Sequence, residues 1–421
     1  MRRFLFMALV ALVLLVAPAT AQARTRLDAR VDALTPATLL TLDASSLVDP
    51  ARQRRARAIA DYRHLASAAW GISQILAFWW LWRSGTAGRI CAAMRRRTRR
   101  RVLHRIVFGA VLGALGPVVG LPFAFAGYRI AFGAGVTDQT LGAWFTSYLV
   151  RIGLDALAGA VIVAVVLALV ERVRTWYLVV AVLLFVFGVG GVMVQPLLPI
   201  GVPVKTTPRF LAAMGEEIAN AVGVPGTPVV LLATSRRGSA LTSSARGIGP
   251  TARVAIGDVV LEHLTVPELR VVLARNDEHV RFADPLRQVL LALVLLVLSA
   301  AMAVLLTDRV GFRRDDDALS RLALVAAFLG LTMAATYPIF NAYTRNIERR
   351  ADLATIGVVQ DRAVIVRTFV RYADLDMIPL CDRRSVRWYF DDRPALGARI
   401  AAVAGTADPC PGGRPAQGLI P

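Results

Sequence analysis

Long charge-free apolar stretches alternate with polar, arginine-rich segments along most of the chain. A bilayer core about 30 Å thick requires roughly 20 helical residues, and five of the six stretches reach or approach that length. The third stretch is short but extends back through Ile152. Buried helices of a soluble protein are seldom so uniformly apolar. The pattern therefore predicts six membrane-spanning helices, at Leu65–Trp82, Ile106–Tyr128, Ala156–Val170, Trp176–Val204, Val289–Leu306 and Leu322–Ala342.

The first 23 residues have the pattern of a signal peptide. Met1-Arg2-Arg3 is followed by an apolar run to Ala17 and then by Ala21-Gln22-Ala23, as expected for a basic start, an apolar core and a cleavage site. The apolar run is also long enough to remain as a membrane anchor. Residues 24–204 then form an N-terminal membrane domain with four of the predicted spans.

Two polar segments flank the last two spans, and both show the patterns of a small folded domain. In residues 205–284 the patterns predict a helix from Pro208 to about Val222, a strand at Thr227–Thr234, a polar loop at Ser235–Gly249, a strand at Ala252–Gly257 and a connection at Asp258–Leu264. Thr265, Pro267 and Glu268 then open a helix that runs through His279.

The chain continues with two spans in residues 285–342 and a second polar segment in residues 343–405. Helices are predicted at Asn341–Ile356 and from Asp361 onward, and residues 406–421 are predicted to form a disordered tail. The fold class predicted is a mainly α, multi-pass helical membrane protein with a small α+β domain inserted between spans.

The composition supports a membrane protein. The 421 residues are 56% hydrophobic and carry a formal net charge of +20. This apolar content excludes intrinsic disorder, and a nucleic-acid binder with such a charge would be far more polar. We therefore expect the lipid bilayer, and no nucleic acid, as a partner.

An arginine run between the first two spans gives a hint of orientation. Arg95–Arg101 contains six arginines, and such runs usually stay on the cytoplasmic side of a cell membrane. Taken alone, the run places residues 205–284 and 343–421 outside the cytoplasm. Because those segments are also arginine-rich, the rule does not decide firmly. The three cysteines, Cys91, Cys381 and Cys410, have no metal-binding spacing, but an extracytoplasmic Cys381–Cys410 disulfide is possible.

Three short motifs carry the candidate chemistry. The predicted helix reads VVLARNDEH at 271–279, the segment after the last span reads NAYTRNIERRAD at 341–352, and YFDDRP at 389–394 is followed by Arg399-Ile400. In order and spacing they resemble the M48 membrane zinc metallopeptidases, specifically the Ste24-type CAAX prenyl protease branch. That family has VLAHELGH, ExxAD and HPxxxxRI at these places. The resemblance covers roughly residues 50–400 and implies a zincin-like domain.

In that family, two histidines one helical turn apart grip a zinc ion, a glutamate activates the bound water, and a distant glutamate completes the ligands. The resemblance places the first histidine at Arg275, the general base at Asn276 and the second histidine at His279. It places the third ligand at Glu348, with Asp352 one turn further along the same helix. The later histidine falls at Arg393, and the substrate strand falls at Thr242-Ser243.

The departures argue against catalysis. An arginine side chain has no lone pair to offer a metal, and an asparagine cannot act as a general base. The other histidines, His64, His104 and His263, are too far from His279 in the sequence to replace Arg275. Metal binding would depend on His279, Glu348 and either Asp277 or Glu278. We therefore expect no cofactor, and zinc only if the site works in an irregular way.

An electrostatic hypothesis follows for the positions that would bind zinc. Without a metal, Glu348 would be an unpaired carboxylate in a partly buried site, which is costly. The Arg275 guanidinium could take the position of the metal and pair with Glu348. The alternative is that both are ordinary solvated charges on adjacent helices.

Three functions remain open from the sequence. The first is a pseudoprotease that binds a peptide by strand addition near Ala252–Gly257, binds a lipopeptide in an intramembrane chamber implied by the resemblance, or regulates another membrane protein. The second is an active zinc endopeptidase with an irregular site. The third is a transporter-like protein, for which Asp155 near a span edge is weak support.

Overall fold

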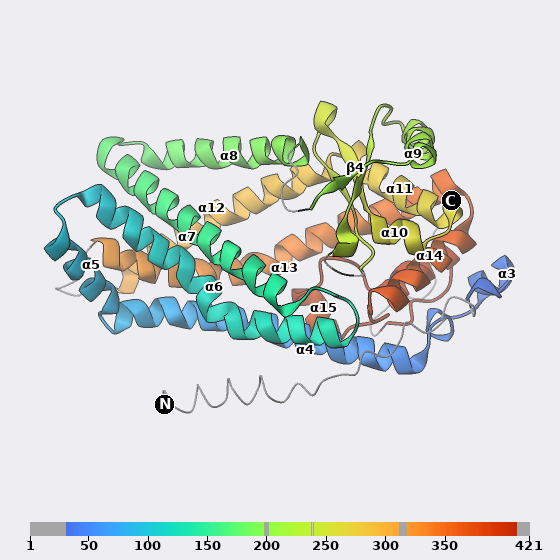
Figure 1. Cartoon of the computed structure of the whole chain (residues 1–421), viewed down its shortest axis with the longest axis horizontal. Coiled ribbons are helices and arrows are strands. Elements are labelled where there is room, and N and C mark those ends of the chain that lie inside the picture. The colour runs from blue at the N-terminus through green and yellow to red at the C-terminus, as the bar shows by residue number, and fades with distance from the viewer. Residues whose placement is uncertain (1–30, 198–201, 237, 239, 311–317, 411–421) are drawn as a thin grey trace.

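The computed structural model describes residues 31–197, 202–236, 238, 240–310 and 318–410 (Figure 1). The predicted signal peptide or anchor, residues 1–23, and the end of the predicted tail, residues 411–421, lie outside the described residues.

Six long helices form a closed ring. In order around it they are α4 (Pro50–Arg83), α6 (Arg101–Gly133), α7 (Leu141–Arg172), α8 (Trp176–Val194), α12 (Asp284–Val310) and α13 (Ala318–Val359). Each contacts the next, and α13 contacts α4 again. The short helix α5 (Thr86–Arg97) lies at one end of the ring, and the sheet lies near the other (Figure 1).

Five of these helices are long and apolar enough to cross a membrane: α6, α7, α8 with its extension to Leu197, α12, and α13 from Leu319. The multi-pass prediction is therefore confirmed for five of its six spans. The predicted span Leu65–Trp82 lies in α4, which is not among them. Its four tryptophans and its Gly, Ser and Gln residues lower the hydropathy of that stretch. The predicted Trp176–Val204 span was too long, because α8 ends at Val194 and Val204 begins a strand.

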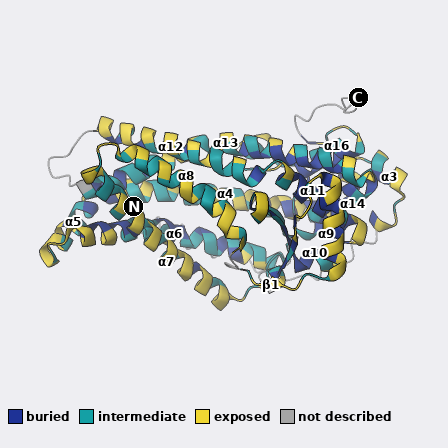
Figure 2. Ribbon diagram, turned by 90° about the horizontal axis from the view of Figure 1, so that it is seen from above, coloured by how far each residue is buried: buried dark blue, intermediate teal, exposed yellow. Residues whose placement is uncertain are grey.

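Exposure differs sharply between the two ends of the molecule (Figure 2). The helices α7 and α8 are largely exposed, with large apolar side chains such as Leu154 and Phe187 uncovered. Around α11, α14 and α16 most residues are buried. Exposed apolar faces of this extent are expected where lipid is the solvent.

The inserted domain contains a four-stranded sheet. Its strands are β1 (Val204–Lys205), β2 (Val229–Leu232), β3 (Ser243–Arg246) and β4 (Arg253–Gly257), in the order β1-β2-β4-β3. β2 and β4 are parallel, and the outer pairs are antiparallel. The helices α9 (Arg209–Val222), α10 (Asp258–His263) and α11 (Val266–Arg281) complete this part of the domain. Apolar residues of α9, β2, β4 and α11 share one core, among them Leu211, Leu231, Ile256 and Leu273.

The strand patterns for β2 and β4 and the helix patterns for α9 and α11 are confirmed. The predictions of a loop over the whole of Ser235–Gly249 and of a plain connection at Asp258–Leu264 are wrong, because β3 and α10 lie there. β3 is a half-buried edge strand with the sequence Ser-Ser-Ala-Arg, so it lacks the apolar alternation that identifies strands.

A single helix, α13, joins the last span to the second half of the domain. The sequence analysis divided it into a span ending at Ala342 and a separate helix, but its 42 residues are continuous, a length of about 63 Å. Pro338 lies inside it and cannot donate to the carbonyl of Ala334. That carbonyl accepts a hydrogen bond from the Tyr389 hydroxyl at 3.0 Å instead.

The remaining helices are α14 (Arg362–Leu375), α15 (Arg384–Tyr389) and α16 (Leu396–Ala404). Cys381 and Cys410 form a disulfide, and Cys410 is buried. Both sulfur atoms lie close to Gly397, where a Cβ atom would be only 3.2 Å from each of them. Residues 406–410, predicted as part of a disordered tail, are therefore held against α16.

An N-terminal arm packs on this domain rather than on the ring. It comprises residues 31–53, with α3 (Pro36–Thr41), the 3₁₀ turn η1 (Ala44–Ser46) and the start of α4. Leu39 and Leu47 share a core with Phe369 and Ile400, and Arg371 donates to Asp32 at 2.9 Å. Residues 31–53, predicted as part of the membrane domain 24–204, thus contact the second half of the inserted domain.

Candidate functional site

The site is built on α11, whose start is firmly fixed. The Thr265 backbone N–H donates to the Glu268 carboxylate at 2.8 Å, completing a capping box. Arg371 on α14 donates to the other oxygen of Glu268 at 2.5 Å. Arg275 and His279 lie about two and three turns further along, and their i, i+4 spacing places them on one face of the helix.

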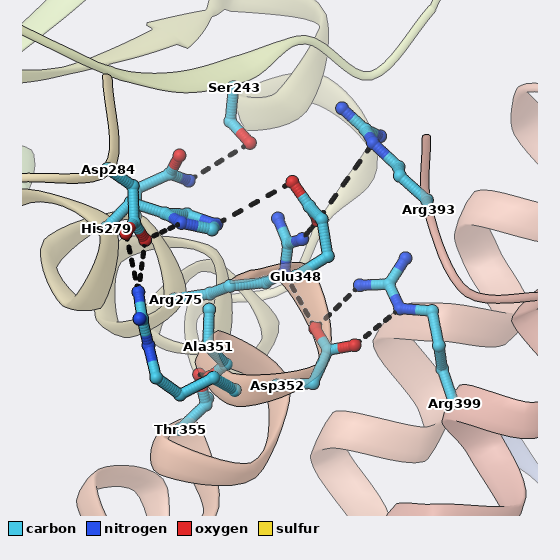
Figure 3. Close-up of polar contacts among 12 residues, drawn as sticks. Ser243, Arg275, His279, Asp284, Glu348, Ala351, Asp352, Thr355, Arg393 and Arg399 are labelled. Carbon is cyan, nitrogen blue, oxygen red and sulfur yellow. Dashed lines mark hydrogen bonds and ion pairs between the residues drawn. The ribbon is translucent and has the colours of Figure 1, made fainter. Parts of the chain in front are cut away.

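Arg275 lies against two carboxylates of α13 (Figure 3). Its Nη2 contacts Glu348 Oε2, and its Nε donates to Asp352 Oδ1 at 2.8 Å. The side chain is almost fully buried. Burial lowers the pKa of Arg275 to about 10, although the neighbouring Asp352 carboxylate opposes that shift. Arg275 therefore keeps its positive charge at neutral pH.

A second arginine completes the pairing of Asp352. Arg399, on α16, donates from Nε to Oδ2 at 2.7 Å and from Nη2 to Oδ1 at 2.8 Å. Such two-point contacts are the strongest arginine–carboxylate geometry. Asp352 therefore joins α11, α13 and α16 through buried charges.

His279 is held from the opposite side. Its Nδ1 lies 2.9 Å from Asp284 Oδ2 at the start of α12, and its Nε2 lies 3.8 Å from Glu348 Oε1. Arg350 also donates to Asp284, at 2.5 and 2.6 Å. Burial lowers the pKa of His279, so the ring is neutral at pH 7.

Asn276 performs a structural task where the family has its catalytic base. Its Nδ2 donates to the Val272 carbonyl at 2.7 Å and to Ser243 Oγ at 3.1 Å. Ser243 is also hydrogen-bonded to the side chain of Tyr372 on α14. The predicted substrate-strand residue Ser243 thus begins the edge strand β3 and is tied to α11, while Thr242 precedes it.

Arg393 is the most open charge of the group. Its side chain is 55% exposed, and its Nε lies 4.0 Å from Glu348 Oε2. Together with Thr242, Ser243, Arg275 and Asn276 it lines a cavity of about 1180 Å³. The cavity extends from these residues along α4 and α13.

The side chains present do not fit a zinc ion. The first ligand position holds a protonated guanidinium, which has no lone pair and occupies the carboxylate that a metal would need. His279 and Glu348 remain as donors, two where tetrahedral zinc sites use three or four protein ligands. Across the described residues, no group of three or more His, Cys, Asp and Glu side chains is arranged to hold a metal.

The structure brings together most of the residues that the sequence identified. Six of them lie close together, and Ser243 lies on the adjoining strand. The six are Arg275, Asn276, His279, Glu348, Asp352 and Arg393. Asp284 and Arg350 were missed. The sequence did contain a signal for Asp284, because a carboxylate five residues after His279, at the start of the next span, is a candidate partner for that histidine. Asp155 lies apart on α7, 3.8 Å from Arg151.

Comparisons with known proteins agree with this fold. The model of peptidase family M48 matches residues 206–407, and that of the CAAX prenyl protease N-terminal region, described as five membrane helices, matches residues 54–200. A Bacillus subtilis (strain 168) protein named uncharacterized metalloprotease YhfN is 24% identical over 332 residues, which are 75% of this chain and 77% of that protein. The crystal structure of S. mikatae Ste24p superposes with a TM-score of 0.70 at 17% identity, over 90% of this chain and 97% of that one.

Proposed function

Because the chain belongs to peptidase family M48, we propose that it is a membrane pseudoprotease, which keeps the metallopeptidase fold, does not cleave peptides and binds a peptide or lipopeptide. The observation that carries this proposal is the contact of Arg275 with Glu348. A fixed cation stands where the family binds its metal. The neighbouring Asn276 side chain cannot accept a proton from water.

The guanidinium serves as an internal replacement for the metal. Arg275, Arg399 and Arg350 supply three positive charges, and Glu348, Asp352 and Asp284 supply three negative charges. These three carboxylates are therefore balanced with no bound ion. This balance supports the proposal that the protein folds and functions without zinc.

The peptide partner is expected at β3, not at β4. Ala252–Gly257 was the strand first considered, but β4 is paired on both sides, with β2 and with β3. β3 is the edge strand beside the cavity, and an edge strand offers the free backbone groups that strand addition requires.

Metal analysis of the purified full-length protein tests the proposal. We expect far less than one zinc per chain after purification with zinc present. The double variant Arg275→His, Asn276→Glu restores the two lost residue types, and we expect it to gain zinc because His279 and Glu348 keep their places. Stoichiometric zinc in the unaltered protein would overturn the proposal, as would peptide cleavage that a chelator abolishes.

A second candidate function is an active zinc endopeptidase with an irregular site. The observation in its favour is that His279 Nε2 faces Glu348 Oε1 at 3.8 Å, so two ligand positions of the family stay side by side. This candidate requires Arg275 to leave Glu348. Chelator-sensitive cleavage that is lost in His279→Ala would favour it over the pseudoprotease.

We also infer that the peptidase-like domain faces away from the cytoplasm of a cell membrane. Three observations support this orientation. The domain contains the Cys381–Cys410 disulfide, and disulfides persist on oxidising sides of membranes. The N-terminal arm, which follows the signal-like sequence, packs on this same domain. The exposed arginines that end α5 lie at the opposite end of the molecule (Figure 1).

Single-cysteine labelling in intact cells tests the orientation. Arg281→Cys places a thiol on the exposed side of α11, and Arg96→Cys places one on α5. We expect a membrane-impermeant maleimide to label Arg281→Cys in intact cells and Arg96→Cys only after lysis. The reverse pattern would overturn the orientation.

A further inference from the structure

The cavity beside the site changes character along its length. Its wall on α4 begins at Ala60 and ends at Phe78, a distance of about 27 Å along the helix. The first part carries Arg63, His64 and Ser67, and the second carries Ile72, Ile75 and Phe78 together with one polar side chain, Gln74. Opposite the second part lie Met333 and Ala334 of α13. One end of the cavity is therefore polar and the other is apolar.

Within the described part of the chain, two guanidinium groups at the polar end have no carboxylate within 4 Å that is not already paired with another arginine. Arg393 is 4.0 Å from Glu348, a carboxylate that Arg275 already contacts. Arg63 is exposed and lines the cavity from α4. Both act electrostatically on Asp376, which accepts the Leu241 backbone N–H at 2.8 Å. Both groups line the same cavity, Arg63 from α4 and Arg393 from the segment after α15. Asp376 is not among the lining residues, and burial raises its pKa to about 7.

The other carboxylates of the cavity have different neighbours. Asp391 lies 3.4 Å from His64 Nε2, and Asp382 interacts chiefly with Asp391, His64 and Asp61. Asp392 lines the cavity next to them in the chain. Glu348 and Asp352 are already balanced by Arg275 and Arg399. The place between Arg63 and Arg393 is thus suited to an acidic group supplied by a ligand.

The apolar end has room for a long hydrocarbon chain. The whole cavity, about 1180 Å³, exceeds the roughly 300–1,000 Å³ typical of small-molecule pockets. Gly71 lines the cavity, and a Cβ atom placed there would meet nothing within 4 Å. The space lies between α4 and α13, the second of which is a span, so an acyl chain in it would stay at membrane depth.

We propose that the cavity binds a single-chain anionic amphiphile, with its acidic headgroup between Arg63 and Arg393 and its acyl chain between α4 and α13. This ligand class deepens the proposed function and rests on it, because a bound zinc ion would displace Arg275 and change the charge at the polar end. A carboxylate and a phosphate monoester share the chemistry that the guanidinium groups recognise.

Binding of four probes to the purified full-length protein in a neutral detergent tests this inference. Oleate and oleoyl lysophosphatidate carry the acidic group, and oleyl alcohol and oleoyl lysophosphatidylcholine carry the same chain without a net negative charge. We expect the acidic probes to bind at least tenfold more tightly. A stronger response to one acidic probe identifies carboxylate or phosphate as the natural headgroup.

Three variants and two controls locate the site. Arg393→Gln and Arg63→Gln should each weaken binding of the acidic probes about tenfold, the loss typical of a hydrogen bond to a charged group, and leave oleyl alcohol unchanged. Gly71→Leu fills the apolar end and should weaken oleate more than octanoate. Arg281→Gln, on an exposed side chain of α11, and Gly142→Leu, where α7 is open, should bind as the unaltered protein does.

Equal binding of acidic and neutral probes would overturn the inference, as would unchanged binding in Arg393→Gln and Arg63→Gln. Circular dichroism and a melting curve for each variant separate lost binding from lost folding. Zinc content is measured on the same samples. Absent zinc with absent lipid binding contradicts this inference alone, whereas stoichiometric zinc contradicts the proposed function whatever the lipid result.

Discussion

The ring of spans and the junction of α11, α13 and α16 are held together by opposite means. In the ring, α6 and α7 approach so closely at Gly109, Gly113 and Gly159 that any side chain would collide with the backbone of the other helix. Its charged pair Arg151–Asp155 is about half exposed, and in the pair Arg105–Glu171, which joins α6 to α7, the carboxylate is about half exposed. At the junction, the contacts are buried ion pairs centred on Asp352 and Glu348. Shape specifies the first region, and charge balance specifies the second.

This difference predicts which substitutions each region tolerates. A close helix crossing fails when atoms are added. A buried ion pair fails when one partner is removed, since the remaining charge is left without compensation. The junction should therefore be the more sensitive region to loss of a single group.

The largest expected effect is that of Asp352→Asn. The change leaves Arg275 and Arg399 with one carboxylate, Glu348, between them, so we expect a loss of about 3–5 kcal/mol in stability, measured by thermal unfolding in detergent. Asp308→Asn is the control, because Asp308 is mostly exposed in its pair with Arg321 and exposed pairs contribute about 1 kcal/mol or less. Similar melting temperatures for the two variants would contradict the charge-balance account.

An intermediate effect is expected for Gly113→Leu in α6. A Cβ at this position would lie 2.1 Å from the Asp155 carbonyl oxygen, so the α6–α7 crossing must open, at a cost of about 1–3 kcal/mol. Gly127→Leu on the same helix meets nothing within 4 Å and should be neutral or slightly stabilising. The comparison fails if the two variants unfold at the same temperature.

The smallest effect concerns Asp277, a buried carboxyl on α11 outside the ion-pair network. Burial, reinforced by Glu278, raises the pKa of Asp277 to about 7. The protonated form is favoured in the folded state, so stability is fully present below about pH 4 and declines as the pH rises through 7. Asp277→Asn removes this titration and should stabilise the protein at pH 8 but have little effect at pH 4. Melting curves at both pH values provide the measurement, and equal shifts would contradict the prediction.

The sequence was informative where one local pattern dominates. Uniform apolar runs revealed five spans, and Thr265 with Glu268 marked the start of α11. β3 escaped because an edge strand of Ser, Ala and Arg has no apolar alternation. The continuity of α13 was not predicted, because its composition changes from apolar to charged along the helix while the backbone hydrogen bonds continue.

Motif spacing predicted which residues form most of the candidate site, but it did not predict all of the contacts between them. The i, i+4 spacing put Arg275 and His279 on one face, and the family pattern put Glu348 opposite. Arg350 and Asp284 are 66 residues apart in the chain, so their contact depends on how α12 and α13 return to α11. The N-terminal arm is a similar case, because Leu39 finds its core with residues more than three hundred positions away.

The unbroken α13 has a mechanical consequence. The helix α13 begins in lipid and carries Glu348 and Asp352 near its other end. A movement of its membrane-spanning part would therefore be transmitted to these two carboxylates. A change in bilayer thickness tilts spans, and a tilt of α13 would shift both carboxylates relative to Arg275 and Arg399. Tyr389 is hydrogen-bonded to α13 at the carbonyl that Pro338 leaves without a backbone donor. The loop with Arg393 would therefore move together with α13. A change in bilayer thickness would therefore alter the contacts between these carboxylates and the arginines.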